Sequence, residues 1–411
     1  MDKNVCMSLA GWLSTSYCLT MHFPNLDLGA ILTRTRVGTP MWLSLLACLL
    51  SIQSAQAADD DGFTPLFNNR DLSGWVNVNC APSTWTVRDN MIICTGIPTG
   101  VLRTEKQYEN FILEADWMHL KTGGNSGMFV WSGALPICGQ PFTKAVECQV
   151  LDGNHGDVFA IQGATFVPDR PHPKGWMRCL PSESRSNPAG QWNHYRIECQ
   201  NGRVQLAVNG KVVAGGSKTI PRKGYIVLES EGSDIYFKNI RVKELPGSDV
   251  PEAEVAEADR GFKSLYTGVD LSGWKVAAGQ DAHWTAKDWI LDCDGKAEGE
   301  NKNLTSEKSY ADFELIMDWK TPAKPSPQEV PILLGAAVPQ IKITKPPGQW
   351  NRAVITVTGA KTRISVNDQP AVDGPALPAE KPPIILLHRP EGISFANLYI
   401  RTLSARSSPA N

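Results

Sequence analysis

The feature that most constrains the fold of this 411-residue chain is an internal duplication. The run Asp-Leu-Ser-Gly-Trp occurs at residues 71–75 and again at 270–274, and Gly-Gln-Trp-Asn occurs at 190–193 and at 348–351. A period of about 200 residues indicates a duplicated domain and not a solenoid of short repeats. We therefore predict four segments: an N-terminal extension with a signal peptide (1–57), a first domain (62–245), a solvated linker (246–260) and a degenerate second domain (261–403).

Both copies alternate apolar and polar residues with a period of two, which is typical of half-buried β-strands. Residues 203–208 form one such run, and the Asn-Gly pair at 209–210 favours a tight hairpin turn after it. Long runs with a helical period are absent, while 35 Gly and 29 Pro favour many turns. We expect an all-β fold of two tandem jelly-roll β-sandwiches, in which Val204, Leu206 and Val208 point into the first core.

The N-terminal segment has the pattern of a targeting signal. Apolar residues dominate 38–52, Arg34 and Arg36 precede them, and the run Ala-Gln-Ala at 55–57 follows as a small-residue cleavage site. This order is typical of a secretory signal peptide, and the apolar run is shorter than the roughly 20 residues of a membrane-spanning helix. We predict export to the periplasm or the extracellular space without a transmembrane segment, and the alternative is a lipoprotein anchored at Cys48.

Charge and cysteine content restrict the partners. The chain has 40 Lys and Arg against 42 Asp and Glu, so it lacks the basic surplus expected of a nucleic-acid-binding protein. After export, Cys138 and Cys179 could form a disulfide between loops, while Cys94, Cys148 and Cys199 lie in apolar runs and are expected to be buried thiols. No Cys-x-x-Cys pair occurs, so we predict no zinc site.

The two copies differ in length in one place, and that place predicts the functional site. The offset between matching motifs falls from 202 at Trp117 and Trp319 to 158 at Trp192 and Trp350, so the second copy lacks about 44 residues. In the first copy the same stretch holds most of the side chains suited to catalysis. A copy that retains the scaffold without this stretch is expected to keep the fold and lose the site.

Strand parity selects the candidates within that stretch. Glu147 and Gln149 alternate with the apolar Cys148 and Val150, so we expect the two polar side chains on the outer face of their strand. Carboxylate, amide and indole groups on one sheet face suit a sugar, because polar groups bind hydroxyls and an aromatic face stacks on the ring. A solvated sheet face and ordinary turn residues are the structural alternatives. The candidates are Asn125, Trp131, Glu147, Gln149, Asp152 and His155.

Six motifs of the first copy occur in a fixed order, at residues 67–75, 125–127, 147–152, 190–193, 208–210 and 226–242. Together they resemble the 3-keto-disaccharide hydrolase domain family, over residues 62–245 and more faintly over 261–403. The resemblance implies a concanavalin A-like jelly roll, export, and action on sugars oxidised at carbon 3. The family has a Leu-Gln-x-His-Gly stretch where this chain reads Leu-Glu-Ser-Glu-Gly, which makes Glu229 and Glu231 candidate substrate-binding residues.

The resemblance predicts a hydrolase or lyase that acts on 3-keto-glycosides. A ketone at carbon 3 acidifies the hydrogen on carbon 2, so a carboxylate can remove it and the enolate can expel the aglycone from carbon 1. We expect Glu147 to be the base and His155 the acid, with Gln149 and Asn125 binding hydroxyls or the enolate oxygen. A two-carboxylate glycosidase mechanism with Glu147 and Asp152 remains open. No cofactor is evident; a divalent metal could polarise the ketone, but no ligand spacing requires one.

The rival prediction is a non-catalytic secreted carbohydrate-binding or adhesion protein, because paired sandwiches raise avidity. In either case we expect the second copy to fold around the apolar runs at 332–334 and 384–387. Without a counterpart of the candidate site it would do no chemistry. Its predicted role is to hold a protein partner, a cell surface or one end of the substrate.

Overall fold

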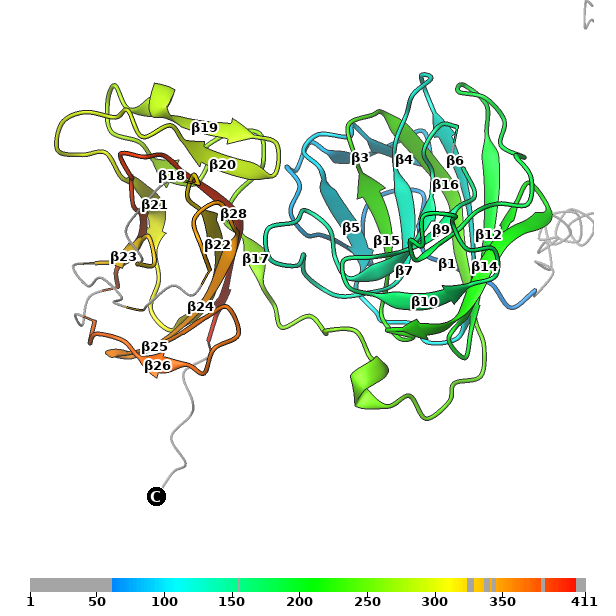
Figure 1. Cartoon of the computed structure of the whole chain (residues 1–411). Helices are drawn as coiled ribbons and strands as arrows, with labels where there is room; N and C mark the ends of the chain where they lie inside the picture. Colours follow the sequence, from blue (N-terminus) through cyan, green and yellow to red (C-terminus); the bar gives the residue numbers. More distant parts are fainter. Residues whose placement is uncertain are drawn as a thin grey trace, which may run out of the picture. The chain divides into compact units, whose positions relative to one another are not determined.

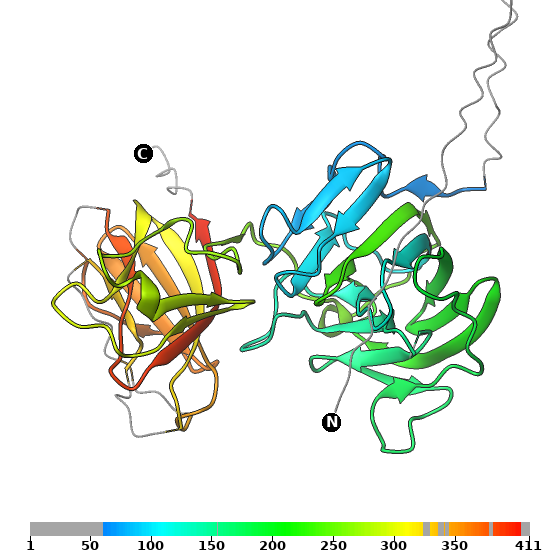
Figure 2. The ribbon, with the colours of Figure 1, turned by 90° about the horizontal axis from the view of Figure 1, so that it is seen from above.

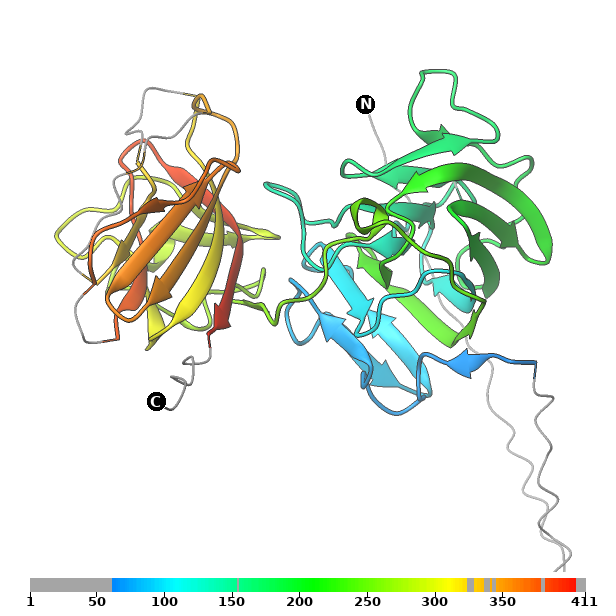
Figure 3. The ribbon, with the colours of Figure 1, turned by 90° about the horizontal axis from the view of Figure 1, so that it is seen from below.

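The computed structural model describes residues 61–153, 155–323, 329–335, 341, 345–377 and 381–403. The predicted signal peptide and Cys48 lie outside these residues. Across the described ranges the chain forms strands, loops and two short 3₁₀ turns, η1 (Glu252–Glu254) and η2 (Asp281–His283), with no α-helix. No helix in these ranges has the length and apolarity to cross a membrane. Figures 2 and 3 show the same all-β character from above and from below.

The first copy forms two antiparallel sheets, most of whose strands are labelled in Figure 1. Its large sheet has the spatial order β10 (Thr165–Pro168), β14 (Lys211–Ile220), β13 (Arg203–Val208), β12 (Asn193–Gln200), β6 (Phe111–His119), β16 (Ile235–Glu244), β4 (Met91–Cys94) and β3 (Trp85–Arg88), and β1 (Thr64–Pro65) pairs with β16. Its small sheet has the order β11 (Arg178–Cys179), β9 (Val158–Ile161), β8 (Ala145–Gln149), β7 (Gly127–Ser132), β15 (Tyr225–Ser230), β5 (Gly100–Thr104) and β2 (Trp75–Asn77).

The second copy also forms a large and a small sheet. The large sheet has the order β19 (Trp284–Lys287), β20 (Ile290–Cys293), β28 (Ile393–Thr402), β22 (Phe313–Lys320), β24 (Asn351–Thr358), β25 (Lys361–Val366) and β26 (Val372–Asp373), and β17 (Lys263–Ser264) pairs with β28. The small sheet has the order β18 (Trp274–Lys275), β21 (Leu304–Ser309), β27 (Pro383–Leu386) and β23 (Ile332–Leu334). The prediction of two tandem jelly-roll sandwiches is confirmed.

Alternation along the strands builds the core of the first sandwich. Val204, Leu206 and Val208 are fully buried in one hydrophobic cluster, as their shared parity predicts. The Asn-Gly pair at 209–210 connects β13 to β14, and both residues have positive φ, 47° and 84°. That conformation matches the right-handed twist of a hairpin and explains the two residue types.

The two large sheets repeat the same central pairing. In the first, β6 lies between β12 and β16, and Trp117 is opposite Asn193. In the second, β22 lies between β24 and β28, and Trp319 is opposite Asn351. The two small sheets differ, because the described strands of the second include no counterpart of β8, β9 or β11.

Most residues of the linker are exposed, and a few of them bond to the first sandwich. The Ala256 amide donates to the Lys223 carbonyl at 2.8 Å, and Glu254 pairs with Arg222. Asp259 accepts an ion pair at 2.8 Å from Arg103, whose side chain is 2% exposed. Because a buried guanidinium needs a carboxylate partner, Asp259 compensates the burial of Arg103.

The predicted disulfide between Cys138 and Cys179 is absent, and both residues are free thiols. Cys179 belongs to β11 and is fully buried in the core, whereas Cys138 lies in the loop between β7 and β8. The prediction of buried thiols is confirmed for Cys94, Cys148 and Cys199, all of which belong to the first core cluster. Apolar neighbours along the sequence therefore predicted the buried thiols correctly, whereas the loop positions expected of Cys138 and Cys179 led to a wrong disulfide prediction.

Candidate functional site

The candidate site is centred on Glu147, in the middle of the small sheet of the first sandwich. Glu147 belongs to β8, between β7 and β9, while its neighbours Cys148 and Val150 belong to the core cluster on the other face. The side chain is therefore on the outer face of the sheet, as parity predicts. It is only 7% exposed, so it is not part of an ordinary solvated surface.

A glycine on the neighbouring strand brings a second carboxylate to Glu147. A Cβ atom on Gly127 would stand 2.8 Å from Glu147 Oε1 and 2.9 Å from Glu229 Oε2, so any larger residue there would collide with both. β7 lies between β8 and β15, and Gly127 leaves the space in which the two side chains converge. Glu229 is 1% exposed, and it approaches Glu147 on the outer face of the sheet.

The Asn-Ser-Gly motif positions this site with all three of its residues. Asn125 donates through Nδ2 to Glu231, and its backbone amide donates to Ser233 Oγ at 2.8 Å. Ser126 Oγ donates to the Glu229 carbonyl at 2.8 Å, which ties the loop before β7 to the end of β15. The motif thus places Glu229 and Glu231 beside the strand that carries Glu147.

Burial and mutual repulsion perturb all three carboxyl groups. Burial raises the pKa of Glu147 to about 8; the charge of Glu231 adds to the rise and the nearby Arg178 opposes it. Burial raises the pKa of Glu229 well above its ordinary value, and the charges of Glu147 and Glu231 act in the same direction. Burial also raises the pKa of Glu231. Carboxyl groups with raised pKa values can hold and release protons near neutral pH, as acid–base catalysis requires.

The sequence did not single out Arg178 and Asp157, which form a buried ion pair at the edge of this site. Arg178 Nη2 and Nε both contact Asp157 Oδ2. The Asp157 side chain is 2% exposed, and burial raises its pKa against the effect of Arg178. Both residues lie within the stretch that the second copy lacks, and that loss was the signal that could have identified them.

Trp131 is not at the candidate site, contrary to the prediction. Its side chain is fully buried in the first core, where Nε1 donates to the Glu109 carbonyl at 2.7 Å and the ring packs edge-on against Phe111. The physical reason is a break in strand alternation. Trp131 has a φ of 53°, and the pairing of β7 with β15 shifts register between Tyr225 and Val227.

His155 and Asp152 are also separated from Glu147. His155 stacks on Trp117 of the core at 4.9 Å, and its Nδ1 lies 2.8 Å from Ser186 Oγ. Burial lowers the pKa of His155 to about 4, so it is neutral at neutral pH. Asp152 accepts a hydrogen bond at 2.8 Å from the amide of Gly123, 29 residues away, so it connects two loops. Gln149, in contrast, pairs with Gly127 across β7 and β8 and shares the face of Glu147.

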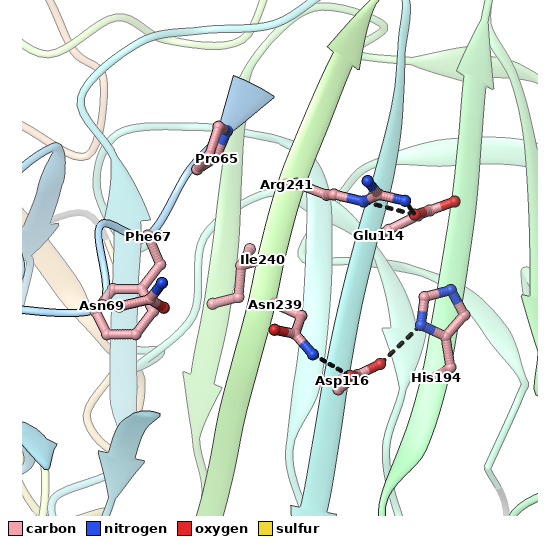
Figure 4. Close-up of a pocket in the computed structure, with 9 residues that line it drawn as sticks. All are labelled: Pro65, Phe67, Asn69, Glu114, Asp116, His194, Asn239, Ile240 and Arg241. Atoms are coloured by element: carbon pink, nitrogen blue, oxygen red, sulfur yellow. Dashed lines mark hydrogen bonds and ion pairs between the residues drawn. The ribbon is translucent and has the colours of Figure 1, made fainter. Parts of the chain in front are cut away.

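A separate pocket of about 380 Å³ lies over the outer face of the large sheet. Figure 4 shows its charged residues paired with one another: Glu114 with Arg241, and Asp116 with both His194 and Asn239. His194 Nδ1 lies 2.7 Å from Asp116 Oδ1. Because its carboxylates are already paired, we assign the pocket a structural role. Among the described residues, no group of three or more His, Cys, Asp or Glu side chains is arranged to hold a metal ion.

The sequence matches a family model described as the 3-keto-alpha-glucoside-1,2-lyase-like domain. The match covers residues 62–243 and 261–329, which together are more than half of the chain. The chain belongs to this family. The second stretch shows that the degenerate copy is of the same kind as the first. Membership of this family indicates that the chain is a carbohydrate-active, glycosidase-like protein.

Solved structures similar to this chain include a protein from Parabacteroides distasonis ATCC 8503 assigned as a glycosyl hydrolase, with 24% identity and a TM-score of 0.36 over 45% of this chain and 94% of that one. The carbohydrate-binding module CBM66 from Bacillus subtilis has 12% identity and a TM-score of 0.32 over 42% and 96%. A beta-1,3-1,4-glucanase derived from a mouse hindgut metagenome has 12% identity and a TM-score of 0.31 over 44% and 97%. No curated protein matches the sequence.

Proposed function

We propose that the first sandwich is a lyase that cleaves 3-keto-glycosides by elimination. The observation that carries the proposal is the pair of buried carboxyl groups, Glu147 and Glu229, that converge over Gly127. Two neighbouring carboxyl groups whose pKa values are raised to different extents can act as a base and an acid in one reaction. The family description names a 1,2-lyase on a 3-keto-glucoside, and elimination needs such a pair.

Glu147 acts as the base, because its pKa is raised to about 8 and a substantial fraction is ionised near that pH. It takes the proton from carbon 2, and the electron pair of that C–H bond forms the enolate of the carbon 3 ketone. The enolate then forms the double bond between carbons 1 and 2 as the bond from carbon 1 to the aglycone oxygen breaks. Glu229, whose pKa burial also raises, donates the proton to that oxygen. Water can add to the product in a later step, which would give net hydrolysis.

The position of His155 removes it from this scheme, since it stacks on Trp117 on the core side of the sheet. Asn125 and Gln149 remain as candidates to bind hydroxyls or the enolate oxygen. For a direct two-carboxylate glycosidase, Glu229 replaces Asp152 as the partner of Glu147. Retaining glycosidases hold their carboxyl groups about 5–5.5 Å apart, and the two oxygens that flank Gly127 are compatible with such a separation.

The test is to incubate the full chain with methyl 3-keto-α-glucoside and with methyl α-glucoside. Elimination predicts release of methanol and an unsaturated ketone, visible by its ultraviolet absorbance, from the keto sugar alone, because only the ketone acidifies the hydrogen on carbon 2. Release of methanol from both sugars would instead indicate direct hydrolysis. Retention of sugar without any product would support the rival function, a carbohydrate-binding protein.

Export to the periplasm or the extracellular space is also a proposal, and it rests on the pattern of a signal peptide at residues 1–57. The second sandwich is proposed to hold a protein partner or a cell surface, because its described small sheet includes no counterpart of β8. Fractionation of cells that express the full chain, with N-terminal sequencing of the product, tests the export proposal. Cleavage after Ala57 is the expected result, and a cytoplasmic chain that keeps its N-terminus would contradict it.

A further inference from the structure

Of the polar atoms left without partners around Gly127, two are amide oxygens, which accept hydrogen bonds, and one is a carboxyl oxygen, which accepts when Glu229 is ionised. Among the described residues, the buried side-chain atoms at this site that lack a partner are Asn125 Oδ1, Gln149 Oε1 and Glu229 Oε2. The free oxygen of Glu229 is directed into the cluster, since it would lie 2.9 Å from a Cβ on Gly127. A buried acceptor without a donor is costly, so we expect water or a ligand to supply donors to these atoms.

The site also carries more acidic than basic groups. Glu147, Glu229 and Glu231 influence one another electrostatically, and the cation that acts on Glu147 is Arg178. The guanidinium of Arg178 is already paired with Asp157, so it leaves little positive charge for the three carboxyl groups. When these carboxyl groups are ionised, their negative charge exceeds the nearby positive charge, which favours a positively charged ligand.

This acidity is specific to the first sandwich. Leu228 pairs with Leu102 in the first small sheet, and Leu386 pairs with Leu304 in the second, which aligns the two strands. The residues that correspond to Glu229 and Glu231 are therefore Leu387 and Arg389. An apolar and a basic residue form the same fold there, so the scaffold does not require the two glutamates.

We propose that this site selects glycosides that carry a protonated amine and rejects glycosides that carry a carboxylate. The proposal rests on the proposed function, because it concerns the substrate of the same site. An ammonium group offers three donors and no acceptor, which is the complement of the three free oxygens. A uronic acid would add another carboxylate to the cluster and repel it.

Ligand binding is linked to proton release from the cluster. Raised pKa values mean that the carboxyl groups hold protons at neutral pH to relieve their repulsion. A bound ammonium relieves the same repulsion, so protons leave as the ligand enters. Calorimetry in two buffers with different ionisation enthalpies measures this release directly.

The experiment measures binding of four methyl glycosides to the full chain at pH 7: the glucosaminide, its N-acetyl derivative, the glucoside and the glucuronide. Acetylation removes the charge and keeps the sugar, so it is the matched control. We expect the amine to bind at least tenfold more tightly than the N-acetyl sugar, with proton release, and the glucuronide to bind most weakly. Glu231→Gln should lower the ratio of amine to N-acetyl affinity several-fold, whereas Glu198→Gln on β12 should leave it unchanged.

Equal affinity for the amine and its N-acetyl derivative would overturn the proposal, and so would tight binding of calcium chloride that abolishes the preference for the amine. These sugars lack the 3-keto group, so the binding result is independent of whether elimination occurs. Conversely, turnover of neutral and amino 3-keto-glycosides at equal rates would contradict this inference and leave the lyase proposal intact.

Discussion

The two sandwiches share a frame and differ in one sheet. Trp75 Nε1 donates to the Leu66 carbonyl at 2.7 Å, and Trp274 Nε1 donates to the Leu265 carbonyl at the same distance. These matching bonds, together with the matching register of the large sheets, show that the duplicated motifs are scaffold. Features that both copies have retained therefore say little about chemistry.

The small sheets carry the difference. The first contains β8 with Glu147, whereas the described strands of the second end at β23. In that second sheet Ile332, Leu334, Ile384 and Leu386 alternate into the core, so the fold persists without the lost strands. The strands on one side of β7 can be lost with little damage to the core, and one of them, β8, carries the candidate Glu147. The comparison places the candidate Glu147 on a strand that the second copy lacks, whereas Glu229 lies on β15, whose counterpart β27 is retained.

The largest expected effect is on catalysis by the first sandwich. Glu147→Gln keeps the size of the side chain but removes the base, so turnover of methyl 3-keto-α-glucoside should fall by about 10²–10⁴-fold. The measurement is the initial rate of methanol release from the full chain.

The matched control for that loss is Glu198→Gln, which changes a strand glutamate of the large sheet in the same sandwich. Its rate should equal that of the unmodified chain. If Glu147→Gln retained full activity while both variants remained folded, the site would have to be sought elsewhere in the molecule, the second sandwich included.

The next largest effect concerns stability: the Glu147 carboxylate supports the proposed reaction, but it lowers the stability of the folded first sandwich. The pKa of Glu147 rises from 4.5 to about 8 on folding, so the folded state disfavours the ionised form. Both states are protonated below pH 4.5, and the unfolded state gains by ionising first as the pH rises. Glu147 therefore destabilises the first sandwich progressively from about pH 4.5 to pH 8, by an amount on the order of a few kcal/mol.

Glu147→Gln should accordingly stabilise the first sandwich more at pH 8 than at pH 4.5. Chemical denaturation, monitored by hydrogen exchange in peptides from each sandwich, measures the stability of the first sandwich separately from that of the second. The second sandwich should show no change at either pH. An equal loss of stability at both pH values would mean that the carboxyl group is paired in a way the proposed mechanism does not include.

The sequence predicted much of this molecule because much of it follows from short-range pattern. Alternation placed Val204, Leu206 and Glu147 on their correct faces, and the Asn-Gly pair marked a hairpin. The duplication and the missing stretch indicated the correct sheet. These features depend on neighbours along the chain, which a single sequence displays directly.

The wrong predictions of side-chain position arose where one residue interrupts the alternation of a strand, or where contacts between distant segments determine the position. The positive φ of Trp131 ends the alternation and turns the indole into the core, and no local pattern announced it. His155 is close to Glu147 in sequence, but the chain crosses to the core side after β8. The pairing of Glu147 with Glu229 joins strands far apart in sequence, so only the fold could reveal it.

A smaller effect tests whether the two frames are energetically as well as geometrically alike. Trp75→Phe and Trp274→Phe each remove one Nε1 donor and leave a carbonyl without it. Each variant should destabilise its own sandwich by about 1–2 kcal/mol, from the hydrogen bond and the lost ring area. Hydrogen exchange in the full chain reports the two sandwiches separately. Losses of stability that differ several-fold between the variants would show that this hydrogen bond contributes unequally to the stability of the two sandwiches.

The smallest effect concerns one position at which the two frames differ chemically. Asp116 is bound by His194, whereas the corresponding Asp318 is bound by Arg352. The hydrogen bond to Asp116 raises the pKa of His194, so the stabilisation is complete below about 6.5 and is lost as the pH rises through the raised value. Arg352 does not titrate in this range. His194→Arg, made in the Glu147→Gln background, should therefore remove the His194 contribution to the change in stability between pH 6 and pH 8 and leave the contributions of Glu229 and Glu231. Because the His194 side chain is 41% exposed, the difference should be only a few tenths of a kcal/mol. A titration of the His194 ring by NMR with no upward shift of its pKa would refute the argument.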